Sequence, residues 1–130
     1  MNFDSSYEVK YDRRFENWVK KNFPRHLKSV LDEKLRYFTE NPRHPSLNTK
    51  PYGGINTQTL KRLCIDEVYE FYINRKMYRC LVYVIHETKE LIIAFIGTHD
   101  QLRNFIKNKW KLSKNITFNT NLKGIKFLIA

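Results

Sequence analysis

The chain has 130 residues, and its 42% hydrophobic and 15% aromatic content excludes a disordered protein and predicts one domain, residues 1–130. Its formal net charge of +11 favours a polyanionic partner, such as nucleic acid or an acidic protein. No apolar run approaches the roughly 20 residues that cross a bilayer, and the first residues lack a signal-peptide pattern. We therefore expect a cytoplasmic protein with no membrane partner.

The first part of the chain predicts a strand followed by a helical hairpin. Residues 7–11 alternate weakly between polar and apolar, and Asp12 then suits the N-cap of a helix over residues 13–22. Pro24 interrupts that helix and suits the first position of a new one. Apolar residues at three- and four-residue spacing predict the second helix, from Leu27 to Phe38, which ends before Pro42. The apolar stripe of this hairpin should be buried against a sheet.

The middle of the chain predicts a three-stranded antiparallel meander. After a turn-rich loop over residues 44–54, residues 55–65 are expected to form a strand or an extended loop. Residues 68–74, 78–86 and 90–96 then form strands joined by short turns, which makes them antiparallel neighbours. Period-two alternation places one apolar set against the helices, namely Tyr69, Phe71, Ile73, Cys80, Val82 and Val84. It also places Glu70 and Arg79 together on the opposite face, which we expect to be open.

The final third is basic and carries less structural signal. Residues 101–110 predict a short basic helix, and residues 124–130 predict a late edge strand. The two cysteines, Cys64 and Cys80, have no zinc-site spacing, and Cys80 is expected to be a reduced core thiol. We expect no cofactor and no metal.

Four short motifs, in their order and spacing, give the chain a resemblance to the RelE/ParE-type toxins of bacterial type II toxin–antitoxin modules. They are His44-Pro45-Ser46-Leu47 before a glycine pair, Val68-Tyr69-Glu70, Tyr78-Arg79, and Ile96-Gly97-Thr98-His99-Asp100. The resemblance covers about residues 7–105 and leaves residues 106–130 as a basic C-terminal extension. It implies an α+β fold in which an N-terminal helical hairpin packs on one face of an antiparallel sheet of four or five strands.

The resemblance also implies a function. RelE-like members of the family enter the ribosomal A site and cleave messenger RNA without a metal, and an antitoxin neutralises them. We therefore expect a translation-inhibiting endoribonuclease whose partners are an acidic antitoxin and ribosome-bound messenger RNA. Two alternatives remain open: a ParE-like inhibitor of DNA gyrase on the same fold, and a nuclease-dead module that binds RNA or protein.

Metal-free RNA cleavage needs a base, a cation for the phosphorane charge and an acid. Arg79 is the predicted cation and His99 the predicted proton carrier. Glu70 acts either as a general base or as an ion-pair partner of Arg79. Asp100 is expected to orient His99 or to bind the antitoxin. The predicted RNA-binding residues are Lys50, Lys61, Arg62, Tyr72, Lys107 and Lys109.

The chain departs from the family pattern at two points. The strand with Glu70 and Tyr72 carries no lysine, and Phe105 stands where a tyrosine often closes the motif. The sequence therefore predicts a scheme that uses Glu and His in place of Lys and Tyr.

Overall fold

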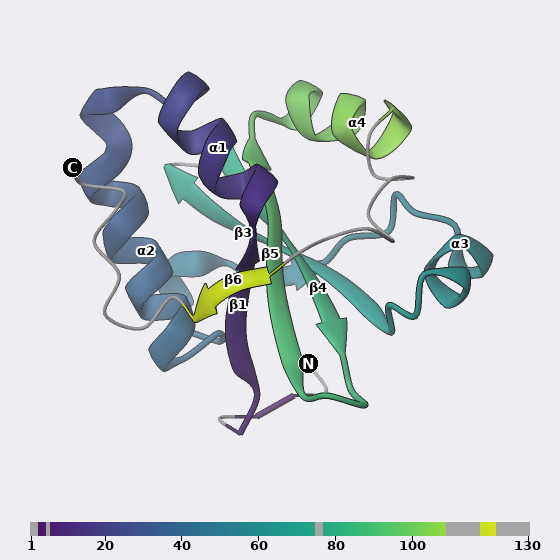
Figure 1. Cartoon of the computed structure of the whole chain (residues 1–130). Coiled ribbons are helices and arrows are strands. Elements are labelled where there is room, and N and C mark those ends of the chain that lie inside the picture. Colours follow the sequence, from purple (N-terminus) through teal and green to yellow (C-terminus); the bar gives the residue numbers. More distant parts are fainter. Residues whose placement is uncertain (1–2, 5, 75–76, 109–117, 122–130) are drawn as a thin grey trace.

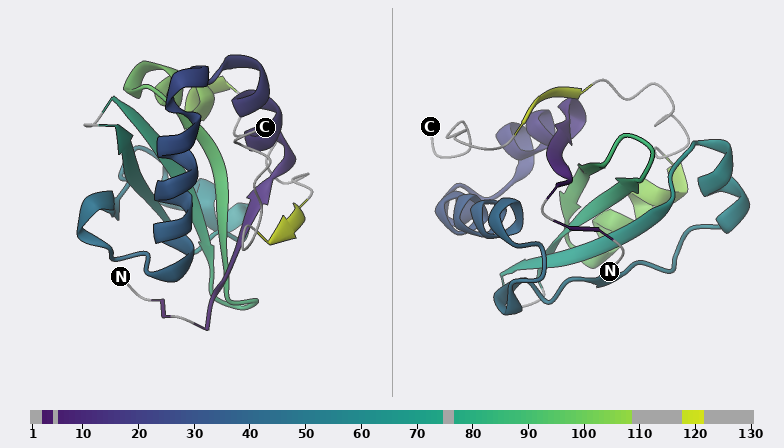
Figure 2. Two further views of the ribbon diagram at one scale, coloured as in Figure 1. Left: turned by 90° about the vertical axis from the view of Figure 1, so that its left-hand side faces the viewer. Right: turned by 90° about the horizontal axis from the view of Figure 1, so that it is seen from below.

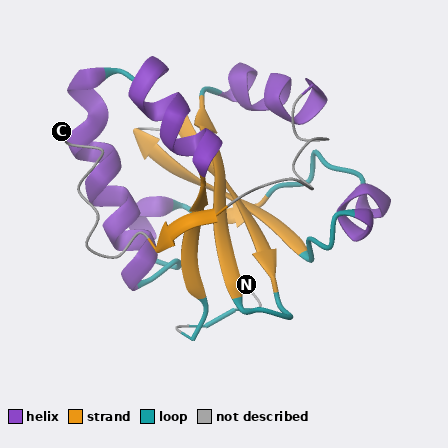
Figure 3. Ribbon diagram, in the orientation of Figure 1, coloured by secondary structure: helices purple, strands orange, loops and turns teal. Residues whose placement is uncertain are grey.

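The computed structural model describes residues 3–4, 6–74, 77–108 and 118–121, and these form a central sheet with helices around it (Figure 1). Figure 3 shows the same arrangement coloured by secondary structure. The elements in chain order are β1 Glu8–Asp12, α1 Arg13–Asn22, α2 Lys28–Glu40, β2 Lys50–Pro51, α3 Thr57–Arg62, β3 Glu67–Asn74, β4 Tyr78–Ile85, β5 Glu90–Gly97, α4 His99–Asn108 and β6 Phe118–Asn121. None of the described helices has the length and apolar character needed to cross a bilayer.

The described part of the sheet has six strands in the order β2-β3-β4-β5-β1-β6. The meander of β3, β4 and β5 is antiparallel, as the short turns predict. β1 lies beside β5 and runs parallel to it, with Val9 opposite Leu91, so the sheet is antiparallel except at this pair. All residues from Leu91 to Gly97 are buried, which confirms β5 as a central strand covered on both faces.

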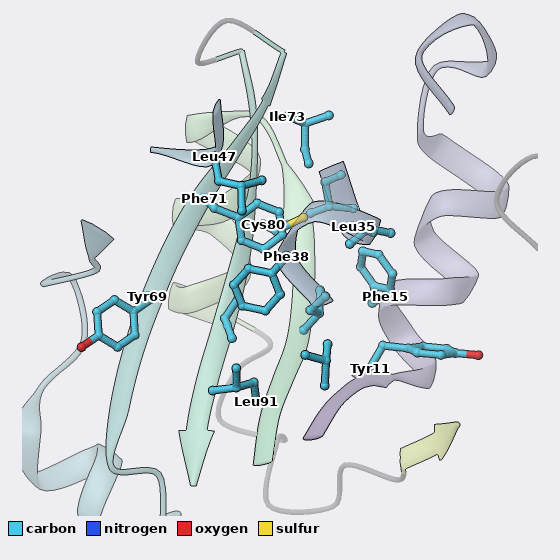
Figure 4. Packing of buried hydrophobic residues seen from close by; sticks show 14 of the residues in the cluster. Tyr11, Phe15, Leu35, Phe38, Leu47, Tyr69, Phe71, Ile73, Cys80 and Leu91 are labelled. Carbon is cyan, nitrogen blue, oxygen red and sulfur yellow. The ribbon is translucent and has the colours of Figure 1, made fainter. Parts of the chain in front are cut away.

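The helical hairpin covers one face of the sheet, as predicted. α1 has the expected bounds, and a 3-10 turn at Arg25–Leu27 follows Pro24 and leads into α2. α2 ends at Glu40, and the backbone of the next residue, Asn41, is extended because Pro42 follows it. Phe38 of α2 stacks on Phe71 of β3 with ring centroids 4.6 Å apart. Figure 4 shows this core, in which the predicted inward residues of β3 and β4 meet the helices.

The second face of the sheet is also covered, which corrects the prediction of an open face. Helix α4 packs there, and Leu102 and Phe105 join Val68, Leu81 and Tyr83 in a second apolar cluster. Figure 2 shows α4 on the side of the sheet opposite α1 and α2. Side chains on this face, including Glu70, are therefore largely withdrawn from water.

Residues 55–65 contribute to this cover as a helix, so the prediction of a strand or an extended loop is wrong. The side chain of Asn56 caps α3 by accepting a hydrogen bond from the Gln58 N–H at 2.7 Å. Leu60 and Leu63 then pack against the second cluster. The cations of this segment, Lys61 and Arg62, remain exposed.

α4 begins at His99, two residues before the predicted start, because a capping box fixes its first turn. The Thr98 N–H donates to Gln101 Oε1 at 2.9 Å, and the Gln101 N–H donates to Thr98 Oγ1 at 3.3 Å. The predicted strand over residues 124–130 lies outside the described residues. A different C-terminal segment, β6, pairs with β1. Cys80 is free and buried as expected, and burial raises the pKa of its thiol well above the ordinary value.

Candidate functional site

Glu70 and Arg79 form an ion pair on the second face of the sheet. Arg79 Nη1 lies 3.0 Å from Glu70 Oε1, and the two side chains are only 14% and 5% exposed. The pairing follows from the register, which places Tyr72 opposite Arg79 and Glu70 opposite Leu81. Of the two roles that the sequence left open for Glu70, the structure shows the ion pair.

Tyr72 lies under two cations at this site. The Arg79 guanidinium carbon is 4.9 Å from the centre of the Tyr72 ring, and Lys50 Nζ is 5.3 Å from it. Lys50 reaches this position because β2 pairs with β3 and sets Lys50 opposite Glu70. The strand with Glu70 carries no lysine of its own, but the neighbouring strand supplies one.

The surroundings of Lys50 keep it protonated. A hydrogen bond with Tyr72, and then the charges of Tyr72 and Glu70, raise the pKa of Lys50 above its ordinary value, against the opposing charge of Arg79. Lys50 is an exposed side chain, so it can meet a substrate directly. It is therefore available as a cation at neutral pH.

A groove of about 890 Å³ lies between α4 and the loop that follows β2. Its lining residues are Tyr52, Gly54, His99, Asp100, Arg103, Asn104, Ile106 and Lys107. Two predicted site residues, His99 and Lys107, are therefore in one groove, and Asp100 is beside them. His99 and Asp100 are both exposed.

Tyr52 connects this groove with the ion pair. Burial raises the pKa of the Tyr52 hydroxyl, and the charge of Glu70 raises it further, while the charges of Arg103 and Arg79 oppose the change. The ring thus lies within electrostatic reach of the pair on one side and of α4 on the other. The candidate region is made up of Arg79 and Lys50 over the Tyr72 ring, together with the groove that Tyr52 and His99 line.

The remaining predicted residues do not join this region. Lys61 and Arg62 are in the last turn of α3, which Figure 1 shows at the periphery of the fold. Neither is among the residues that line the groove. Lys109 lies outside the described residues. Phe105, at the position where a tyrosine often closes the family motif, is a core residue that stacks on Phe95 with ring centroids 4.5 Å apart.

Sequence reasoning missed two residues of the region, Tyr52 and Arg103. Arg103 had a detectable signal, because His99, Arg103 and Lys107 follow one another at four-residue spacing and share one side of a helix. Tyr52 had none, since its position depends on the pairing of β2 with β3. Across the described ranges, no group of three or more His, Cys, Asp or Glu side chains is arranged to hold a metal ion.

Comparison with solved structures identifies the type of fold. No family model matches the sequence, and no curated protein matches it. Among solved structures, the RelE of the RelE–RelB complex from Pyrococcus horikoshii superposes with a TM-score of 0.51 at 15% identity, over 71% of this chain and 93% of that one. A metal-bound toxin from Helicobacter pylori superposes with a TM-score of 0.50 at 17% identity, over 74% of this chain and 98% of that one. The chain thus has the RelE-type toxin fold that the resemblance predicted.

Proposed function

We propose that this chain is the toxin of a type II toxin–antitoxin system and a ribosome-dependent endoribonuclease that cleaves messenger RNA and arrests translation. The observation that supports it best is the pair of cations, Lys50 and Arg79, over the Tyr72 ring of a RelE-type fold that also places His99 in a groove. These residues combine fixed positive charge with an imidazole that can transfer a proton, which is what phosphodiester cleavage by an adjacent hydroxyl requires.

Each residue has a separate role in the cleavage reaction. His99, in its neutral form, takes the proton of the 2′-hydroxyl as the 2′-oxygen attacks the adjacent phosphorus. Arg79 and Lys50 stabilise the negative charge that grows on the phosphorane oxygens. The bond from phosphorus to the 5′-oxygen then breaks, and Lys50 gives that oxygen a proton. The products are a 2′,3′-cyclic phosphate and a 5′-hydroxyl.

Glu70 acts in this scheme as a positioning residue. Its carboxylate is 5% exposed and bonded to Arg79, so it is poorly placed to take a proton from RNA. By binding Nη1 of Arg79, Glu70 holds the guanidinium over the Tyr72 ring, which Lys50 also contacts. The chain's net charge of +11 suits both RNA and the acidic antitoxin that we propose as its partner in the cytoplasm.

The test is induced expression followed by primer extension on messages associated with ribosomes. His99→Gln should reduce cleavage by about 100-fold or more, the usual contribution of a general acid or base. Lys50→Gln should also reduce cleavage, and both side chains are exposed, so circular dichroism should show a folded protein. Lys61→Gln removes an equal charge from exposed α3 and serves as the control, with cleavage unchanged.

The same experiment separates the alternatives. Cleavage that persists in both site variants would contradict the mechanism, and a DNA-damage response in place of translation arrest would indicate a gyrase inhibitor. The burial of Arg79 specifically favours the nuclease-dead binding module as a second candidate, because Glu70 and Tyr72 engage the guanidinium. RNA binding without any cleavage would select that module.

A further inference from the structure

The groove beside α4 has one wall made by the loop after β2, and this wall is fixed in place. The Tyr52 N–H donates to the Val68 carbonyl at 2.9 Å, which continues the pairing of β2 with β3. Gly54 packs against the Tyr52 ring so closely that a Cβ there would lie 2.7 Å from the ring. A side chain at position 54 would therefore displace the Tyr52 ring from its place in the groove.

The other wall is one side of α4. Leu102 is fully buried and Phe105 stacks on Phe95, which fixes the apolar side of the helix against the sheet. Arg103 is consequently turned to solvent. Along this side, His99, Arg103 and Lys107 all line the groove, and their four-residue spacing separates successive residues by about 6 Å along the helix.

A groove lined by one aromatic ring and two permanent cations suits single-stranded nucleic acid. Bases stack on aromatic side chains, and phosphates bind Lys and Arg. Successive phosphates of a strand are separated by a distance similar to that between successive turns of the helix. Asp100 is the acidic residue of the lining, and it faces two permanent cations, Arg103 and Lys107. Because burial and the charge of Glu70 raise the pKa of Tyr52, its ring stays neutral and does not repel a phosphate.

We propose that this groove binds the single-stranded RNA next to the cleaved bond, with one base stacked on Tyr52 and the adjoining phosphates held by Arg103 and Lys107. This inference rests on the proposed function, because it names the residues that hold the substrate of that reaction. It gives Tyr52 the role of binding an RNA base and Arg103 the role of binding a phosphate.

The test is fluorescence-anisotropy titration of the purified protein with a short labelled oligouridine. Stacking contributes about 1–3 kcal/mol per base, so Tyr52→Leu should weaken binding by roughly 5- to 150-fold, whereas Tyr52→Phe keeps the ring and should bind like the parent. Gly54→Ala should weaken binding by displacing the ring. Arg103→Gln should lower the slope of log affinity against log salt by about 0.7, the value for one phosphate contact on a single strand.

The matched control is Tyr37→Leu, the same change at a half-buried tyrosine of α2 that stacks on His44. It should leave RNA affinity unchanged. The site is overturned if the parent does not bind the oligonucleotide, or if Tyr52→Leu binds it like the parent. It is also overturned if oligoglutamate competes as well as RNA of equal charge, since the groove would then suit an acidic peptide.

A cleavage assay on the same variants separates the two proposals. Binding that depends on Tyr52, without cleavage by the parent, supports the groove and contradicts the nuclease function. Cleavage by the parent that Tyr52→Leu leaves unchanged, together with unchanged binding, contradicts the groove and keeps the nuclease function.

Discussion

The ion pair between Glu70 and Arg79 predicts an asymmetric response to mutation. Arg79→Met leaves a carboxylate that is 5% exposed without its guanidinium partner. Removing one member of a buried pair costs about 3–5 kcal/mol, a large part of the 5–15 kcal/mol that typically stabilises a domain. Glu70→Gln should cost less, about 1–3 kcal/mol, because the amide oxygen still accepts a hydrogen bond from Arg79.

A double-mutant cycle measures the coupling. The free energy of unfolding is determined by urea denaturation for the parent, Glu70→Gln, Arg79→Met and the double variant. Because the double variant leaves no buried charge, it should be about 2 kcal/mol more stable than Arg79→Met alone. The reasoning is refuted if Arg79→Met costs less than about 1 kcal/mol, or if the two single changes simply add.

The result also decides how loss of toxicity is interpreted. An Arg79→Ala variant that fails to arrest growth has lost either its phosphate contact or its fold. Comparing variants of equal measured stability separates these causes. His99→Gln is the cleaner test of chemistry, because His99 is exposed.

Two further predictions concern stability. Burial raises the pKa of Glu90, but hydrogen bonds from Lys10 and Thr88 outweigh it and the net shift is downward. A carboxyl group with a lowered pKa in the folded state stabilises the protein at pH values above its unfolded-state pKa, near 4.3. That stabilisation is lost as the pH falls through the folded-state pKa. Glu90→Gln should therefore cost about 0.5–1 kcal/mol at pH 7 and almost nothing below about pH 3, and equal cost at both pH values in urea titrations would contradict this. Thr98→Ala removes the cap of α4 and should cost about 1 kcal/mol. Equal unfolding midpoints for the parent and Thr98→Ala would refute the capping role.

Local patterns predicted the fold wherever neighbouring residues determine it. The alternation in residues 68–84 assigned each side chain to the correct face, because adjacent residues of a strand point to opposite sides. Pro24 and Pro42 marked the breaks around α2 because proline restricts its own backbone and that of the preceding residue. The same alternation placed Glu70 and Arg79 on one face, where the structure shows them paired.

Long-range contacts were not accessible in the same way. Residues 55–65 contain residues that favour strands, and only the Asn56 cap and the apolar cluster beneath Leu60 select a helix. The second face was expected to be open because no local pattern shows where α4 docks. Lys50 and Tyr52 meet the site only through the pairing of β2 with β3, which joins distant parts of the chain.

The parallel pairing of β1 with β5 has a consequence for the order of folding. β1 is the first strand to be synthesised, but its partner β5 is the last strand of the meander. Until Gly97 has left the ribosome, Val9 and Tyr11 have no strand beside them, and Trp18 of α1 has no Phe95 to contact. Such distant contacts slow folding, because a long loop must close before they form. A chain shortened before β5 should accordingly lack the strand that joins β1 to the rest of the sheet, so the complete sheet around Arg79 forms only after β5 has been synthesised.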